Sequence, residues 1–251
     1  MQLLLCEAIG SAEVGAVVEL PPQEARHATA ALRMTTGDLV LVCDGAGRKA
    51  VGRLTVASPT AVVLIESITD EPAPDPSITV VQALAKGEHG ELAIDLMTQV
   101  GVDRIIPWAA QRSIVQLKVD RAEKALVKWQ QTARAAAKQS RRAWLPEVSA
   151  VLGTRQLLTA LADFDALFLL HESASAPLAS AELPARGRIG LIVGPEGGIS
   201  PEEQEHLAGA GALPVLLGPD VLRSSLAGAV GVSVLAARLR WAGPPVSGVG
   251  G

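Results

Sequence analysis

Aromatic residues and cysteines are scarce in this chain. Of its 251 residues, 2% are Phe, Trp or Tyr and none is tyrosine, whereas 49% are hydrophobic. We therefore expect an aliphatic core built from Ala, Val and Leu. The two cysteines, Cys6 and Cys43, stand in apolar runs without metal-ligand or redox spacing. They are expected to be buried free thiols, which fits a reducing compartment.

Long apolar runs, metal-binding patterns and phosphate loops are also lacking. No stretch reaches the ~18 uninterrupted apolar residues that a membrane span requires, and the first residues lack the basic segment of a secretory signal. We expect a cytoplasmic protein with no membrane partner. The four histidines lack ligand spacing, which argues against a bound metal. Neither a Walker loop nor a G-x-G-x-x-G motif occurs, so a nucleotide phosphate cradle is not supported.

A proline-rich stretch at 69–77, TDEPAPDPS, separates two kinds of sequence pattern. Before it, short apolar runs between Gly, Pro and Asp turns predict a small β-barrel or sandwich. One segment there has helical spacing, opened by Pro21 and Pro22 and stopped by Gly37. After it, continuous apolar strands alternate with helices, which predicts an α/β domain whose parallel sheet is covered on both faces. The expected divisions are a first domain 1–69, a linker 70–77, a second domain 78–242 and a disordered tail 243–251.

An unusual loop follows the apolar strand in LIVGPEGGIS, residues 191–200. It holds three glycines and a proline, so its backbone can take positive φ angles and a ligand can approach closely. Ser200 and Glu203 are spaced as a capping box with Pro201 at the first helical position. The loop is therefore predicted to lead directly into a helix N-terminus.

The same arrangement recurs in VLLGP, residues 215–219, and a third strand, ALFLLHE, ends at His171 and Glu172. In open α/β sheets, ligands bind outside the carboxyl ends of the strands. The three strand ends are therefore expected to line one pocket. A plain tight turn at GPEGG is the alternative.

Basic residues concentrate in segment 121–142, RAEKALVKWQQTARAAAKQSRR. It carries seven basic residues and one acid, a local charge of +6 in a chain whose net charge is −4. A solvated helix face usually mixes signs, so this segment indicates a phosphate-facing surface, with an ordinary solvated face as the alternative. Arg48, Lys49 and Arg53 could extend this basic surface. The candidate RNA-binding residues are Arg26, His27, Arg33, Lys86, Arg112, Arg134, Lys138, Arg141 and Arg142.

Five stretches carry a resemblance to a known family: RHATAALRMTTGDLVLVCDGAGR, GELAIDLMTQVGVDRIIPW, AAAKQSRR, VGPEGGISPEE and LGPDVLRSSLAG. In this order they resemble the bacterial ribosomal RNA small-subunit methyltransferases that methylate N3 of a uridine, a family of the SPOUT class. The resemblance implies a PUA-like β-barrel before an α/β methyltransferase domain with a parallel sheet and a deep trefoil knot. It also implies S-adenosylmethionine as the methyl donor, small-subunit (16S) ribosomal RNA or the small subunit as the partner, and a homodimer.

The resemblance further implies roles for residues of the glycine loops. Arg223, in VLR, would be catalytic by stabilising the uridinate that develops as N3 loses its proton. An arginine that pairs with Asp220 or Glu196 is the alternative, and no proton acceptor is identified. The implied donor-binding residues are Leu170, His171, Glu172, Val193, Gly194, Pro195, Glu196, Gly197, Gly198, Leu217, Gly218, Val221 and Leu222.

The chain departs from the family pattern outside the glycine loops. Ser225 and Leu226 stand where many members have an acid and a threonine, and Gln99 replaces a common glutamate. Two other functions stay open: a non-catalytic RNA-binding ribosome-assembly protein on the same fold, and a small-molecule enzyme that uses a nucleotide. The intact glycines favour the methyltransferase. The basic helix and the missing phosphate loop argue against the small-molecule enzyme.

Overall fold

The computed structural model of the chain describes residues 1–57, 60–85, 87–113 and 119–241. Lys86 and the tail 243–251, both subjects of the sequence predictions, lie outside the described residues. The chain divides into two compact units, Met1–Ala73 with Arg134–Leu145, and Pro74–Ala133 with Pro146–Gly251. The domain boundaries expected from the sequence stay predictions.

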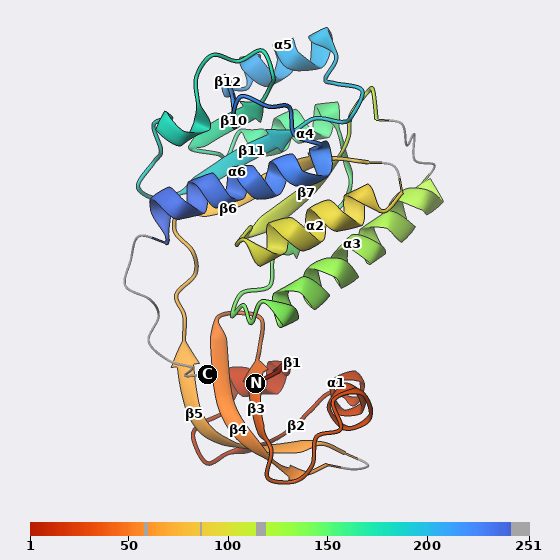
Figure 1. Cartoon of the computed structure of the whole chain (residues 1–251), viewed down its shortest axis with the longest axis vertical. Coiled ribbons are helices and arrows are strands. Elements are labelled where there is room, and N and C mark those ends of the chain that lie inside the picture. Colours follow the sequence, from red (N-terminus) through yellow and green to blue (C-terminus); the bar gives the residue numbers. More distant parts are fainter. Residues whose placement is uncertain (58–59, 86, 114–118, 242–251) are drawn as a thin grey trace. The chain divides into compact units, whose positions relative to one another are not determined.

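The first unit is built on a curled five-stranded sheet (Figure 1). Its strands, in spatial order, are β1 Leu3–Leu5, β3 Leu39–Cys43, β4 Arg48–Val56, β5 Val62–Asp70 and β2 Val17–Glu19. β1 pairs parallel with β3, and the other pairs are antiparallel. The β4–β5 register shifts at Gly52, where a Cβ would lie 2.4 Å from the carbonyl oxygen of Leu64. Such a bulge bends the strand and helps the sheet to curl.

The helix of the first unit is shorter than the sequence predicts. It comprises α1, Pro22–Arg26, and a π-helical turn, His27–Ala31, with Pro22 in its first turn as expected. It ends well before Gly37 because Arg33 adopts a left-handed conformation with φ 54°, and the Met34 N–H donates to the carbonyl of Ala28 at 3.0 Å. Gly37 instead shapes the turn before β3 with φ 97°.

Residues 134–145 belong to the first unit, although the sequence pattern grouped them with the second domain. Their backbone pairs with the β3–β4 turn, since Gly47 N–H donates to Ala143 at 3.0 Å and Leu145 N–H donates to Gly45 at 2.9 Å. The Cys43 thiol also donates to Ala143, at 3.3 Å, and burial raises the pKa of that thiol to about 11. Both cysteines are buried and free, which confirms that prediction.

The second unit contains a parallel sheet of seven strands. The strands are β12 Ala212–Val215, β10 Ala166–Leu170, β11 Arg188–Val193, β6 Ser77–Ala83, β7 Arg104–Ala109 and β8 Glu147–Val148 in spatial order, with β9 Leu152–Gly153 also paired to β7. The helices are α2 His89–Gln99, α4 Thr154–Leu161, α5 Pro201–Gly209 and α6 Ser224–Leu239, together with the part of α3 Val119–Gln139 that precedes Arg134. The trefoil knot implied by the resemblance stays a prediction.

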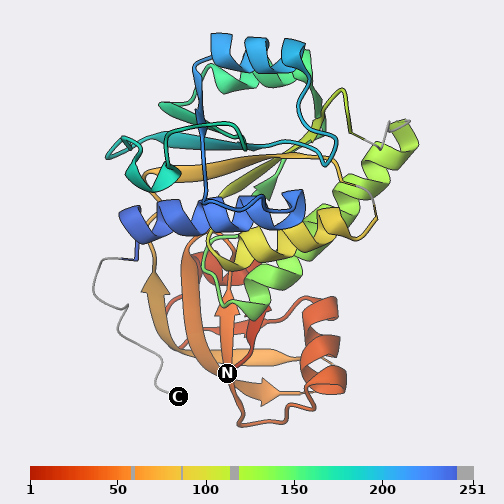
Figure 2. The same ribbon diagram turned by 45° about the horizontal axis from the view of Figure 1, so that its top comes forward.

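Helices cover both faces of this sheet, as the continuous apolar strands predict (Figures 1 and 2). Successive strand residues point to opposite faces. Val80 and Leu191 pack in one cluster with residues of α2 and α6. Val81 and Ile192 pack in another with residues of α4 and α5. The sheet is therefore buried, and its carboxyl edge is left for the site.

Several short elements were not expected from the sequence. They are β8, β9 and α4, and each contributes few residues or lacks a long apolar run. In the described part of the chain, no helix combines the length and the apolarity that a membrane crossing requires.

Candidate active site

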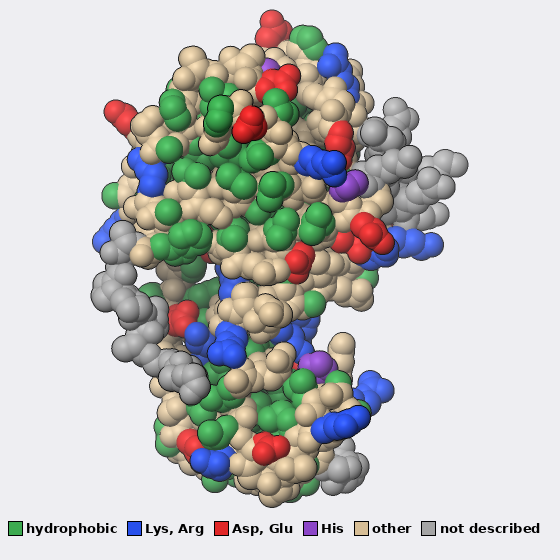
Figure 3. Space-filling model, viewed as in Figure 1, with side chains coloured by type: hydrophobic (Ala, Val, Ile, Leu, Met, Phe, Trp, Pro, Cys, Tyr) green, Lys and Arg blue, Asp and Glu red, His purple; other side chains and the backbone are tan. Residues whose placement is uncertain are grey.

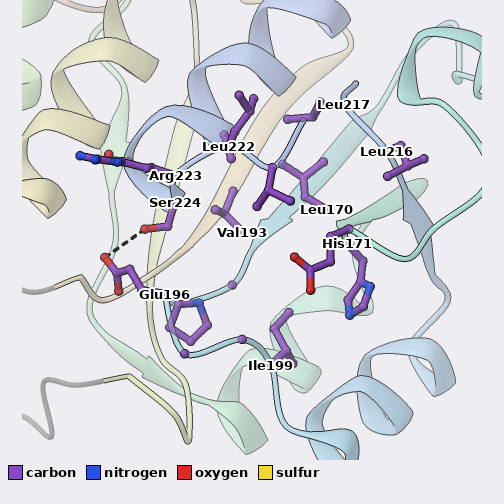
Figure 4. A pocket seen from close by; sticks show the side chains of 18 of the residues that line it. Leu170, His171, Val193, Glu196, Ile199, Leu216, Leu217, Leu222, Arg223 and Ser224 are labelled. Atoms are coloured by element: carbon purple, nitrogen blue, oxygen red, sulfur yellow. Dashed lines mark hydrogen bonds between the residues drawn. The ribbon is translucent and has the colours of Figure 1, made fainter. Parts of the chain in front are cut away.

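One large pocket opens at the carboxyl edge of the parallel sheet. It has a volume of about 840 Å³, and its walls come from the ends of β10, β11 and β12 and from the start of α6. Leu170, Val193, Leu217 and Leu222 form its apolar part, and polar groups lie around them (Figure 4). The volume falls within the ~300–1,000 Å³ range of small-molecule sites.

The loop after β11 forms the first wall, and its glycines have separate structural reasons. A Cβ on Gly194 would lie 2.7 Å from Cγ1 of Ile199, and one on Gly197 would lie 3.2 Å from the backbone oxygen of Arg112. Gly198 has φ 72°, which strains other residues. These glycines permit both a tight turn and close packing beside the pocket, so ligand binding by this loop stays a prediction with the plain tight turn as its alternative.

Helix α5 anchors the end of this loop as the sequence predicts. The Glu203 N–H donates to Oγ of Ser200 at 3.2 Å, and the Ser200 N–H donates to Oε2 of Glu203 at 3.3 Å. This is the reciprocal pattern of a capping box, and Pro201 begins the helix. The glycine loop is thus fixed at its helix end.

The loop after β12 forms the second wall. Leu216 is held by neighbouring backbone, since its N–H donates to Ala176 at 2.9 Å and its carbonyl accepts from Leu178 N–H at 2.8 Å. Gly218 follows, and a Cβ built there meets nothing within 4 Å. Gly218 therefore leaves space that no described residue fills.

His171 and Glu172 follow β10 on the third side of the pocket. The Nδ1 atom of His171 lies 2.8 Å from Oγ of Ser173, and Nε2 lies 3.1 Å from Nε2 of Gln204. Both ring nitrogens thus have partners that fix the imidazole. Glu172 is exposed.

Arg223 projects from the residue before α6, away from the leucines of the pocket (Figure 4). It is exposed and forms no ion pair with Asp220 or Glu196 among the residues that the structure describes. Glu196 instead accepts a hydrogen bond from Oγ of Ser224 at 3.1 Å. The structure thus shows neither of the ion pairs that the alternative requires. The guanidinium of Arg223 is available to a ligand at the pocket.

All residues predicted for donor binding and catalysis line this one pocket. Their binding roles stay predictions, whereas their convergence is a geometric finding. The sequence reasoning missed further lining residues, among them His89, Ile199, Gln204, Leu216 and Ser224. Ile199, Leu216 and Ser224 adjoin the predicted segments, which was a usable signal. His89 comes from the distant α2, and no local pattern points to it.

The predicted RNA-binding residues fall into different environments. Arg26, Arg33, Arg134 and Arg141 are exposed in the first unit, and His27 and Arg142 are half-buried. Arg112 lines the pocket in the second unit. Lys138 lies 2.6 Å from the buried Glu24. The basic residues of the first unit are therefore not equally available to phosphates.

The three basic residues proposed to extend the basic surface form ion pairs with acidic residues. Arg48 pairs with Asp70 at 2.7 Å, Arg53 pairs with Glu66 at 2.7 Å, and Lys49 pairs with Glu71. The hydrogen bond from Arg48 lowers the pKa of Asp70. Part of the positive charge of β4 is thus neutralised within the sheet.

Comparisons with known proteins agree with this architecture. A family model for an RNA methyltransferase domain matches residues 71–236, and one for an RNA methyltransferase PUA domain matches residues 20–67. Ribosomal RNA small subunit methyltransferase E of Mycobacterium bovis is 39% identical over 230 residues, which cover 89% of this chain and 87% of that protein. The protein of that name from Bacillus subtilis is 32% identical over 215 residues, covering 82% and 84%.

A solved structure extends the similarity to three dimensions. Ribosomal RNA small subunit methyltransferase E from Neisseria gonorrhoeae, bound to S-adenosyl methionine, matches with a TM-score of 0.84 and 28% identity. The match covers 95% of this chain and 98% of that one. The fold class is confirmed: a PUA domain precedes a SPOUT-type α/β methyltransferase domain. The chain belongs to the RNA methyltransferase family, among whose members are these small-subunit ribosomal RNA methyltransferases.

Proposed function

We propose that this chain transfers a methyl group from S-adenosylmethionine to N3 of a uridine in small-subunit (16S) ribosomal RNA. The observation that carries the proposal is the convergence of both Gly-Pro loops and Arg223 on one pocket, in a chain of the RNA methyltransferase family. Such a reaction takes place where ribosomes are assembled, in the cytoplasm. Among the described residues, no group of three or more His, Cys, Asp or Glu side chains could hold a metal ion.

The pocket fits the chemistry of this donor. Leu170, Leu217 and Leu222 supply apolar surface for an adenine ring, and the open backbone at Gly218 leaves N–H and C=O groups within reach of a ligand. Bound S-adenosylmethionine supplies an electrophilic methyl group on a positively charged sulfur. The carboxylates of Glu172 and Glu196 lie around the pocket and can complement that positive charge.

Arg223 is the residue that we propose for catalysis. Uridine N3–H is a weak acid, so negative charge develops on the base as the proton leaves. An exposed guanidinium at the edge of the pocket can stabilise this charge and present two or more N–H donors to it. Glu196 accepts a hydrogen bond from Oγ of Ser224, at the start of α6, and forms no ion pair with Arg223 among the described residues. The position of Arg223 thus suits stabilisation of the uridinate.

RNA binding is proposed for the exposed arginines of the first unit. Arg26, Arg33 and Arg141 are exposed and have no ion-pair partner among the described residues. Unpaired guanidinium groups are suited to phosphate oxygens, and the binding that they give should weaken with salt. Arg112 lines the pocket of the second unit, and we propose that it contacts the RNA there.

A homodimer is proposed through the second unit. Hydrophobic side chains gather over α2 and α6 on one face (Figure 3). Leu92 of α2 is 46% exposed and Leu226 of α6 is 41% exposed, and the two helices pack side by side. Exposed apolar surface of this kind is typical of a subunit interface. Replacing both leucines with glutamate should halve the mass measured by sedimentation equilibrium, and an unchanged mass would contradict this interface.

Calorimetric titration with S-adenosylmethionine, with ATP as the control, separates an enzyme from a binding protein on the same fold. The proposal predicts saturable binding of S-adenosylmethionine and none of ATP. Binding of neither ligand in the presence of small ribosomal subunits would favour a non-catalytic assembly protein.

A further inference from the structure

Glu203 is a carboxylate with 4% of its surface exposed, and its two oxygens hold separate parts of the site together. Oε2 accepts from the backbone N–H of Ser200 at 3.3 Å and from its Oγ at 3.1 Å. Oε1 accepts from the backbone N–H of Gln111 at 2.8 Å and from Oγ1 of Thr154 at 2.8 Å. The first two bonds complete the helix cap. The bonds from Gln111 and Thr154 reach across the fold and are not needed for capping.

The bond from Gln111 attaches Glu203 to the turn that carries Arg112. Gln111 and Arg112 belong to a turn that is closed by a hydrogen bond from Ser113 N–H to the carbonyl of Ala110 at 3.0 Å. The Arg112 backbone oxygen would lie 3.2 Å from a Cβ on Gly197, so this turn packs directly against the glycine loop. Both Arg112 and Gly197 line the pocket. The hydrogen bonds of Glu203 thus hold turn 110–113 against the loop after β11.

An ionised carboxylate suits this position better than any other side chain. All four groups that bond to the Glu203 carboxylate are N–H or O–H donors. An ionised carboxylate only accepts hydrogen bonds, so it matches all four. A glutamine would turn its NH₂ group toward the donors of either Ser200 or Gln111. The hydrogen bonds on that side would then be lost. Thr154 extends the network, because its Oγ1 also accepts from Nε1 of the fully buried Trp108 at 3.2 Å.

We propose that Glu203 is a positioning residue for the donor site. It sets the width of the pocket by holding turn 110–113 against Gly197, and it does not line the pocket itself. The inference rests on the proposed function, because the ligand whose affinity it controls is S-adenosylmethionine.

The test is calorimetric titration of Glu203→Gln with S-adenosylmethionine. We expect Kd to rise about tenfold. This is the effect expected when one charge-assisted hydrogen bond is lost and the pocket wall at turn 110–113 is no longer held in place. Glu202→Gln is the matched control, since Glu202 is exposed in the first turn of the same helix and should leave Kd unchanged. Thr154→Val should give an intermediate rise, and Thr154→Ser, which keeps the hydroxyl, should restore affinity.

Binding stoichiometry separates positioning from a purely structural role. If Glu203 only stabilised the fold, the folded fraction of Glu203→Gln would keep the wild-type Kd, and only the thermal midpoint and the bound equivalents would fall. Positioning predicts a raised Kd with close to one equivalent bound per chain. Equal Kd values for wild type and Glu203→Gln would overturn this inference. Absence of binding by the wild type would instead contradict the proposed function.

Discussion

Lys138 Nζ lies 2.6 Å from Oε2 of Glu24, whose surface is 3% exposed. Arg134 lies 3.9 Å from the other oxygen of the same carboxylate. A buried carboxylate needs a partner to offset its lost hydration. Lys138 therefore has a structural role in the first unit, where it joins the end of α3 to α1, even though its sequence context predicts an RNA contact.

Lys138→Ala should lower the free energy of unfolding by about 3 kcal/mol, because it leaves Glu24 buried without its nearest cation. Chemical denaturation measures this change. Glu24→Leu combined with Lys138→Met should recover much of the loss, since both charges are then removed. A stability change below about 0.5 kcal/mol for Lys138→Ala would contradict the assignment.

Arg141→Ala should weaken binding to small-subunit ribosomal RNA without a comparable loss of stability. Arg141 is exposed and has no ion pair among the described residues, so it can contact a phosphate. The slope of log affinity against log salt should become shallower by about 0.7 for one lost contact. Arg53→Ala is the control, because Arg53 already pairs with Glu66. Equal slopes for wild type and Arg141→Ala would leave Arg141 as part of a solvated surface.

Gly218→Val should weaken the binding of S-adenosylmethionine at least tenfold with little effect on stability. Apart from its two chain neighbours, no atom of the described residues lies within 4 Å of a Cβ at Gly218, so the added side chain projects into space that the proposed ligand would use. Gly209→Val is a control with equally open surroundings on α5, outside the pocket. If Gly218→Val bound S-adenosylmethionine with the wild-type affinity, this loop would not belong to the donor site.

Arg223→Gln should lower kcat by about 100-fold to 1,000-fold, the range found when one group that stabilises a developing anion is removed. The KM for S-adenosylmethionine should change little, because the guanidinium points away from the apolar part of the pocket (Figure 4). Arg223→Lys should recover part of the rate by keeping the charge. A wild-type kcat in Arg223→Gln would exclude the proposed role.

Features that depend on nearby residues could be predicted from the sequence. The capping box joins Ser200 and Glu203, which are three residues apart, and the glycine loops adjoin the strands that they follow. The parallel sheet follows from its continuous apolar strands. Each of these patterns is complete within one short segment.

Contacts between distant segments could not be predicted in this way. Glu203 bonds to Gln111 and Thr154 across 92 and 49 residues, and Lys138 meets Glu24 across 114 residues. Charge pattern alone could not separate a paired lysine from a free one. The early end of the first helix depends on the left-handed conformation of Arg33, a residue type that rarely adopts it.

The most direct test of the central claim is nucleoside analysis of 16S ribosomal RNA after reaction with the purified protein. Small subunits from cells that lack this activity would be incubated with S-adenosylmethionine and the wild-type protein, with Arg223→Gln in parallel. The RNA would then be digested and its nucleosides resolved by mass spectrometry. The account predicts one N3-methyluridine per 16S RNA with the wild type and far slower formation with the variant. No methylated nucleoside, or a methyl group on another base or atom, would contradict it.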